Sequence, residues 1–364
     1  MKAQSINFDY LNLRKEIPLF IKLLIRSAFT RQEPATSGAI LIVNTCLIGE
    51  FAATIPPLRD FIERHPTKTI DLVVTSTVEP LARRIIGVRH VFTAKSVYGR
   101  KNEQGSIQHS SFDTYERTIV LRISRDVYRL VTNIHHGRVS TSVSFFARYG
   151  AHLLWCLILR RTPKRWSEVN FAMLGGTPRT LPVERMLTIE EGDTAFLSDL
   201  EALQTTQKKI IVHTHCYWPA RCWASDKWIA LLKKIHADGG AQFIFVGAAG
   251  EDIQYNEIAP RLDFKTYSLI GKTNLLELFL LMRNAHYFIG IDSGPRNVGH
   301  LADIPSVTIL GPGPHMYTPP NPRDKVIDHS HRRGLYQTFV HTNHPFIDTV
   351  QAEEVYEAYK SLIQ

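Results

Sequence analysis

FIGIDSGPRNVGHLADIPSVTILGPG, residues 288–313, is the stretch from which the rest of the chain can be interpreted. FIGI is typical of a buried strand, and Asp292 and Ser293 after it are residue types that cap a helix start. Pro295 suits the first helical turn. SVTIL, residues 306–310, predicts a second buried strand that ends at a Gly-Pro-Gly-Pro turn. The stretch therefore predicts a strand–helix–strand unit.

The turn between that first strand and the helix can hold an anion, especially a phosphate. At a helix start the first backbone N–H groups have no partner within the helix, and the helix dipole adds partial positive charge. Many parallel sheets contain the same turn with no ligand. The local pattern alone leaves a phosphate site and a purely structural turn as alternatives.

The chain has 364 residues, of which 44% are hydrophobic, and this predicts two domains with packed cores. Cysteines occur at positions 46, 156, 216 and 222 with no C-x-x-C pair, so neither a zinc ribbon nor a disulfide scaffold is expected. The cytosol is the compartment that this cysteine usage favours.

The net charge of +9 and the pI near 9.3 favour an anionic partner: nucleic acid, anionic lipid or a phosphorylated substrate. The charge concentrates in a basic amphipathic segment at 1–32 and around an apolar run within 148–165. Both are too short to span a bilayer. Contact with a membrane surface and ordinary core helices are the two interpretations of these segments. Nucleic acid is disfavoured because no aromatic platform or known motif accompanies the charge.

Apolar runs alternate with helix-like segments along the chain, which favours parallel α/β sheets. The expected strands are 39–49, 69–75, 88–94, 208–215, 241–247, 286–291 and 306–310. A polar, proline-containing passage at 175–193 separates the two series. We therefore predict a basic extension at 1–35, a Rossmann-like domain at 36–187 and a second one at 188–364, whose last helix could pack on either domain.

Doubly wound domains bind their ligands at the carboxyl ends of the strands. Four turns are expected to lie there: Gly49–Glu50, 214–221, Gly247–Glu251 and Asp292–Asn297. His213 and His215 lie on one face of their strand, as metal ligands do, but no third ligand has a recognisable spacing. A metal site is therefore disfavoured.

In the order of these turns the sequence resembles glycosyltransferase family 9, the ADP-heptose:lipopolysaccharide heptosyltransferases, over roughly residues 38–364. The family carries a D-[ST]-G-x-x-H turn, an apolar helix, a proline, a strand and a G-P. The matching residues here are Asp292, Ser293, Gly294, Pro305, Gly311 and Pro312. R-x-W at 221–223 resembles the family's K-x-W, and IGEFAATIPPLRDF at 48–61 resembles its G-D turn and helix.

The resemblance implies an α/β protein of the GT-B fold, with two Rossmann-like doubly wound domains facing a central cleft. It implies inverting transfer of a sugar from a nucleotide-sugar donor, with ADP-heptose as the leading donor, and neither a metal ion nor a further cofactor. The expected acceptor is lipopolysaccharide core or another anionic surface glycan. The protein would be cytoplasmic, with peripheral contact at the inner face of the membrane.

The resemblance also assigns roles in the second domain. Asp292, Ser293 and Gly294 would hold the diphosphate at the helix start. Arg221, where the family has lysine, would neutralise phosphate charge as the donor bond breaks. Glu251 would accept hydrogen bonds from the ribose.

Two further positions of this domain would meet the donor. Thr273 would lie beside the adenine. Asn297 stands where the family has histidine; it can donate a hydrogen bond to phosphate but cannot be cationic. His300, one helical turn later, either faces the same cleft or packs within the helix layer.

Glu50 is the expected catalytic base, at a position where the family has aspartate. Inverting transfer needs a carboxylate that takes the proton of the acceptor hydroxyl. Glutamate keeps this chemistry but moves the carboxylate about one methylene further out. The alternative for Glu50 is a solvated carboxylate favoured by the helix dipole. The alternative for the protein is a non-catalytic sugar-nucleotide-binding module.

Overall fold

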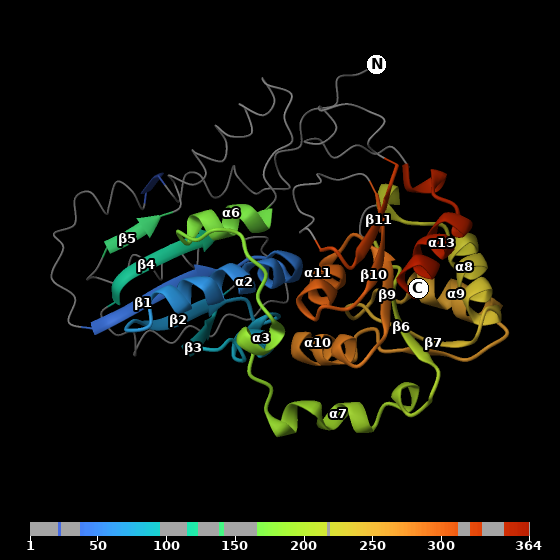
Figure 1. The fold of residues 1–364 in the computed structure, drawn as a ribbon, viewed down its shortest axis with the longest axis horizontal. Helices are drawn as coiled ribbons and strands as arrows, with labels where there is room; N and C mark the ends of the chain where they lie inside the picture. Colours follow the sequence, from blue (N-terminus) through green and yellow to red (C-terminus); the bar gives the residue numbers. More distant parts are fainter. Residues whose placement is uncertain are drawn as a thin grey trace, which may run out of the picture. The chain divides into compact units, whose positions relative to one another are not determined.

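The computed structural model divides into two compact units, residues 1–188 and 189–364 (Figure 1). It describes residues 21–22, 37–94, 115–122, 138–141, 166–216, 219–311, 321–329 and 346–363. The predicted basic extension, apart from residues 21–22, and the whole charged segment at 148–165 lie outside the described residues. Within the described part of the chain, no helix combines the length and the apolar character needed to cross a membrane.

The first unit contains a parallel sheet with the order β3-β2-β1-β4-β5 among the described residues. Its strands are β1 (Ser37–Asn44), β2 (Thr69–Val74), β3 (Val88–Thr93), β4 (Tyr115–Arg122) and β5 (Arg138–Thr141). The central strand β1 is buried from position 39 to its end. This burial explains its continuous apolar run, since a strand covered on both faces has no solvent-facing positions.

The helices of this unit are α2 (Ile48–Arg64), α3 (Glu79–Ala82), α6 (Trp166–Met173) and the 3-10 turn η2 (Val183–Arg185). α2 begins soon after β1 and contains Pro56 and Pro57, which supply no N–H to the helical ladder. It packs against α6, where the Asn170 amide donates a hydrogen bond of 3.2 Å to Thr54 Oγ1. A buried face holds α2 in place despite its two prolines.

The second unit contains a parallel sheet with the order β11-β10-β9-β6-β7-β8. Its strands are β6 (Lys208–His213), β7 (Ala241–Phe245), β8 (Thr266–Ser268), β9 (Tyr287–Ile291), β10 (Ser306–Leu310) and β11 (Asp324–Asp328). The expected strand at 306–310 has these bounds in the structure, and those at 208–215, 241–247 and 286–291 are a little shorter.

The helices of the second unit cover both faces of its sheet (Figure 1). They are α7 (Ala195–Ser198), α8 (Ser225–Ala237), α9 (Ile253–Ile258), α10 (Leu275–Arg283), α11 (Gly294–Leu301) and α13 (Ala352–Ile363). The short 3-10 turns are η3 (Glu191–Thr194), η4 (Glu201–Leu203), η5 (Pro219–Arg221), η6 (Ala259–Arg261) and η9 (Phe346–Thr349).

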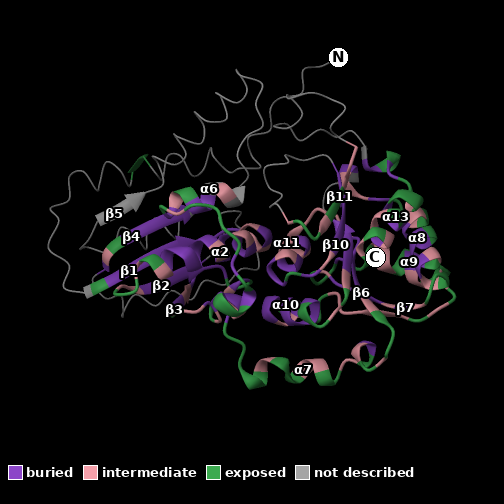
Figure 2. Cartoon of the chain, viewed as in Figure 1, coloured by how far each residue is buried: buried purple, intermediate pink, exposed green. Residues whose placement is uncertain are grey.

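α8 packs against α9 and α13 on one face, and α10 packs against α11 on the other. Trp223 and Trp228 are buried in the core beneath α8, with ring centroids 4.9 Å apart. Figure 2 shows the strands largely buried and the outer faces of the helices exposed. This doubly wound arrangement gathers the carboxyl ends of the strands at one edge, where ligands of such folds bind.

Candidate active site

Polar residues at the carboxyl ends of three neighbouring strands of the second unit contact one another. β6 lies between β7 and β9 and ends at His213, whereas Glu251 follows β7 and Ser293 follows β9. His213 Nδ1 lies 3.0 Å from Ser293 Oγ, and His213 Nε2 lies 3.8 Å from Glu251 Oε2. Two of the residues expected from the sequence are thus joined through a buried histidine.

Glu251 is held as an ionised acceptor. Its Oε2 accepts a hydrogen bond of 2.8 Å from the Ala248 N–H. A side chain at Gly247 would place its Cβ only 2.9 Å from the same oxygen. Burial raises the pKa of Glu251, but the contact with His213, the Ala248 N–H and the nearby histidines outweigh this and lower it to about 2. At neutral pH Glu251 can therefore only accept hydrogen bonds, as from the hydroxyls of a sugar.

His215 is the third member of this group, with Nε2 3.9 Å from Glu251 Oε1. Burial lowers the pKa of His215, against the opposite effect of the Glu251 carboxylate. No set of three or more His, Cys, Asp or Glu side chains in the described residues is placed to hold a metal ion.

Ser293 is the N-cap residue of α11, with an extended backbone (φ −159°, ψ 179°). Its hydroxyl contacts His213 and donates to the Ile291 carbonyl at 3.2 Å, so it does not cap the helix. The helix start has no side-chain cap, and Pro295 in its first turn has no N–H. The first backbone N–H groups of α11 therefore receive no side-chain cap, and helix starts of this kind can bind anions.

The Asp292 side chain is paired within the second unit. Its Oδ1 accepts from Arg296 Nη1 at 3.1 Å. The Arg296 side chain is fully buried and also donates through Nε to Asp324 Oδ2 at 3.0 Å. Asp292 therefore supports the turn through Arg296.

Asp324 is the centre of a buried network beneath α11. Its Oδ1 accepts hydrogen bonds from Ser306 and Thr308, and its Oδ2 lies 2.9 Å from His300 Nε2. Burial alone would raise the pKa of Asp324, but the hydrogen bond from His300 and the charge of Arg296 hold it well below its usual range. Burial also lowers the pKa of His300. Of the two interpretations of His300, packing within the helix layer is confirmed.

The other two donor-side candidates of this unit lie near helix starts. Asn297 is in the first half of α11, and its buried Oδ1 accepts no hydrogen bond within the described residues. Thr273 lies in the turn before α10, next to the N-cap residue Asn274. Asn274 and Glu277 form a reciprocal capping box that fixes this turn.

Arg221 ends η5 and lies against the end of β10. A side chain at Gly311 would place its Cβ 2.9 Å from Arg221 Cα, so only glycine permits this close approach. On the other side, Trp223 is buried, and its Nε1 donates to the Val350 carbonyl at 3.0 Å. The backbone that carries Arg221 is therefore fixed at the carboxyl edge of the sheet.

Cys216 and Cys222 form a disulfide across the loop that contains Arg221, with their Cα atoms 5.4 Å apart. Their spacing did not predict a disulfide. The chain turns back between β6 and α8, and this turn brings the two residues together although they carry no C-x-x-C signal. Cys46 is buried and lies outside this disulfide.

In the first unit, Glu50 lies half-buried in the first turn of α2, close behind the end of β1. Its backbone carbonyl accepts a 2.7 Å hydrogen bond from Thr54 Oγ1. Asn44 and Thr45 at the end of β1 are 4% and 0% exposed. Within the described part of the chain their side-chain oxygens have no hydrogen-bond partner. The sequence does not predict a site at either residue, because two adjacent polar residues give no signal that they are buried.

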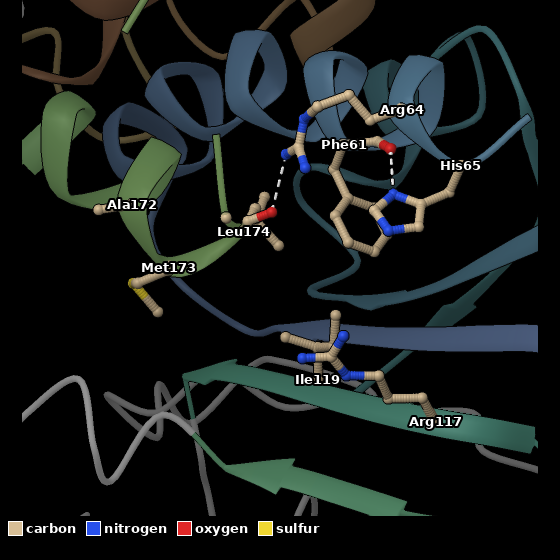
Figure 3. A pocket seen from close by; sticks show the side chains of 9 residues that line it. Phe61, Arg64, His65, Arg117, Ile119, Ala172, Met173 and Leu174 are labelled. Atoms are coloured by element: carbon tan, nitrogen blue, oxygen red, sulfur yellow. Dashed lines mark hydrogen bonds between the residues drawn. The ribbon is translucent and has the colours of Figure 1, made fainter. Parts of the chain in front are cut away.

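A pocket of about 200 Å³ lies elsewhere in the first unit, between the end of α2, the end of α6 and β4 (Figure 3). Phe61, Arg64, His65 and Arg117 line it together with apolar residues. Arg64 is engaged by the Leu174 carbonyl and by Asp60, and His65 stacks on Phe61. At about 1.5 Å per residue along α2, this pocket is roughly 20 Å from Glu50 and is separate from it.

Comparison with known proteins agrees with this architecture. The sequence matches glycosyltransferase family 9 (heptosyltransferase) over residues 160–344. Lipopolysaccharide heptosyltransferase 3 of Escherichia coli is 26% identical over 292 residues, which cover 75% of this chain and 83% of that protein. Its counterpart in Escherichia coli strain K12 is 24% identical over 223 residues, or 54% of this chain and 64% of that protein, slightly under two thirds of its length.

Among solved structures, E. coli ADP-heptose LPS heptosyltransferase II has a TM-score of 0.64 at 18% identity. The match covers 89% of this chain and 98% of that one. At this level of identity the likeness is one of fold. Two parallel α/β units in tandem, each with helices on its sheet, are the GT-B arrangement.

Proposed function

This chain belongs to glycosyltransferase family 9, and from that premise we propose that it transfers a heptose from ADP-heptose to lipopolysaccharide core or a related anionic surface glycan. The relatives named above are lipopolysaccharide heptosyltransferases, and the solved relative is named for ADP-heptose. We further propose that the reaction inverts the anomeric centre without a metal ion.

The observation that carries the proposal is the contact of Ser293 and Glu251 with one buried histidine at the strand ends of the second unit. A nucleoside diphosphate has two polar parts that need opposite kinds of hydrogen-bond partner. Its diphosphate needs N–H and O–H donors, which the start of α11 and Ser293 offer. Its ribose hydroxyls need an acceptor, which ionised Glu251 offers. Both demands are met within one edge of one sheet.

In the proposed reaction the acceptor oxygen forms a bond to the anomeric carbon while the bond from that carbon to the diphosphate oxygen breaks. The acceptor proton passes to the Glu50 carboxylate, and the negative charge passes to the leaving diphosphate. Arg221 and the start of α11 would stabilise that charge. Asn297 would donate a hydrogen bond to phosphate, and Thr273 would lie beside the base.

The cytoplasm is the proposed compartment, because a nucleotide-sugar donor is used there. The net charge of +9 supports contact with an anionic, phosphorylated glycolipid at the inner face of the membrane. That contact would be electrostatic and therefore weakened by salt.

A thermal-shift screen of ADP-, UDP-, GDP- and dTDP-sugars tests the donor, because a ligand of the folded state raises the apparent melting temperature. We expect ADP-heptose to stabilise the protein most. Stabilisation by a non-ADP donor alone would overturn the choice of ADP-heptose. Transfer to lipopolysaccharide core is then compared between the wild type and Glu50→Ala. Donor binding without transfer to any acceptor would replace this proposal with the non-catalytic binding module.

A further inference from the structure

We propose that His213 is a positioning residue that couples the two ends of the donor site, holding Ser293 for the diphosphate and Glu251 for the ribose. The inference rests on the proposed function, since it concerns the same ligand. It adds a residue that is joined to both contact groups and that neither the motif nor the charge pattern had assigned to the donor.

The sheet itself fixes the position of His213. It is the last residue of β6 and pairs in register with Gly290 of β9. Its side chain is only 3% exposed. A Cβ at position 290 would lie 3.1 Å from the His213 carbonyl, so the glycine lets the two strand ends approach closely. The imidazole therefore has little freedom to leave its place between the neighbouring turns.

The two ring nitrogens face different partners. Nδ1 lies 3.0 Å from Ser293 Oγ, and Nε2 lies 3.8 Å from Glu251 Oε2. The charged or titratable groups that face the ring are Glu251 and His215. Asp292, next to Ser293 in the chain, is instead paired with Arg296. One rigid ring thus spans the distance between the acceptor group and the hydroxyl.

Ser293 has one hydroxyl proton, and its hydroxyl donates to the Ile291 carbonyl at 3.2 Å. To bind a phosphate oxygen, the hydroxyl must rotate away from that carbonyl. In the tautomer with hydrogen on Nδ1, Nδ1–H donates to Oγ, and this contact can persist during the rotation because it does not use the hydroxyl hydrogen. His213 would therefore keep Oγ at the start of α11 in both states.

Two conservative variants separate the two contacts of the ring. In His213→Asn, the side-chain amide can occupy the place of Nδ1 and reach Ser293 but not Glu251. In His213→Gln, the longer side chain can reach Glu251 and no longer holds Ser293. We expect each variant to bind ADP roughly tenfold more weakly, about the effect of one lost hydrogen bond. Binding of inorganic pyrophosphate, which has no ribose, should survive in His213→Asn and weaken in His213→Gln.

The kinetic signature is a rise in the donor KM with the acceptor KM and kcat near their wild-type values. A purely structural role would instead lower the melting temperature and the active fraction without changing the donor KM. His286→Asn is the matched control. His286 also bridges β6 and β9, through a 3.1 Å hydrogen bond from the Lys209 N–H, but at the amino-terminal end of β9. Its ADP affinity should equal that of the wild type.

Isothermal titration of ADP and of pyrophosphate into the wild type and the three variants decides the matter. If the wild type binds ADP and the His213 variants bind it equally well, the inference is overturned and the proposed function stands. If the wild type binds no nucleoside diphosphate, the proposed function itself is overturned. If the variants fail to fold, a double-mutant cycle of Ser293→Ala and Glu251→Gln replaces them. Non-additive losses of ADP affinity support the coupling, and additive losses overturn it.

Discussion

The polar residues at the strand ends of the two units differ in how far the protein itself satisfies them. In the second unit His213 contacts both Ser293 and Glu251, and Arg296 is bound by two carboxylates. In the first unit the side-chain oxygens of Asn44 and Thr45 are buried without a hydrogen-bond partner among the described residues. The protein itself thus pairs most polar groups at the strand ends of the second unit, with Asn297 Oδ1 as an exception, whereas the end of β1 retains bonding capacity that a hydroxyl of a substrate could satisfy.

This contrast predicts different effects of mutation. Changes near the end of β1 should alter turnover and the use of the acceptor while leaving stability nearly unchanged. Changes near the end of β9 should alter stability and donor binding together, because the same contacts serve both.

The largest effect is expected for Glu50→Gln, which keeps the shape of the side chain but cannot take a proton. The transfer rate should fall about 10²- to 10⁴-fold, the usual contribution of a general base. ADP affinity should not change. Initial rates and ADP titrations measure the two quantities. Glu79→Gln is the control, since Glu79 also lies in the first turn of a helix of this unit and pairs with Arg83. Equal losses in both variants would remove Glu50 from the chemistry.

Next in size is Arg296→Met in the second unit. The substitution leaves Asp292 and Asp324 without their shared buried cation, which should cost about 3–5 kcal/mol in the free energy of unfolding. Urea denaturation measures this cost. Arg323→Met is the comparison, because Arg323 pairs with Asp303 at 2.8 Å where both side chains are about half exposed. It should lose less than about 1 kcal/mol. Similar losses in the two variants would mean that the burial of Arg296 does not increase its contribution to the free energy of unfolding.

The third prediction concerns pH and Glu251. Its pKa is about 2 in the folded protein and ordinarily 4.5, so its ionised form stabilises the fold above pH 4.5. At about 1.4 kcal/mol per pKa unit, the wild type should exceed Glu251→Gln by roughly 3 kcal/mol at neutral pH. The difference should disappear as the pH falls from about 4.5 to about 2. Unfolding curves of both proteins across this range measure it.

Glu257→Gln provides the reference for an exposed carboxylate of the same unit, and its effect at neutral pH should be within about 0.5 kcal/mol. A Glu251 difference that persists unchanged at the acid end would show that the carboxylate charge is not the source of the stability.

The smallest effect on stability is expected for Asn44→Leu. Replacing a buried, unsatisfied polar group by an apolar one of similar shape should change the free energy of unfolding by less than about 1 kcal/mol, in the stabilising direction. If Asn44 receives an acceptor hydroxyl, the acceptor KM should rise roughly tenfold. Denaturation and acceptor titration measure the two. A clear loss of stability would mean that Asn44 is already satisfied in solution, and the contrast between the units would fail.

The sequence predicted those parts of the fold in which burial is continuous. SVTIL at 306–310 was found with its bounds because a parallel strand covered on both faces is apolar throughout. β4, β5, β8 and β11 were missed. β8 and β11 are short and only half-buried, and in β4 charged residues at both ends leave a short apolar run, so these strands carry no such signal. The expected strand at 39–49 was drawn too long at its end, because the apolar residues Leu47 and Ile48 after β1 continue its apolar run into the start of α2.

In the site, the strand-end rule and the family resemblance selected Ser293 and Glu251, which the structure brings to one edge. The sequence did not predict the contact of His213 with Ser293, because the two residues are 80 positions apart and only the order of the strands in the sheet makes them neighbours. The same holds for Arg296 and Asp324, which are 28 positions apart. Long-range pairs between polar side chains leave no periodic signal in the sequence.

The glycine at 311 sets a boundary for redesign of the enzyme. Even the smallest side chain there would collide with the backbone that carries Arg221. Gly192, by contrast, has no atom within 4 Å of such a methyl group. A redesign of this region should therefore vary Arg221 and keep the glycine at 311, because no space is left for a side chain between Gly311 and the Arg221 backbone.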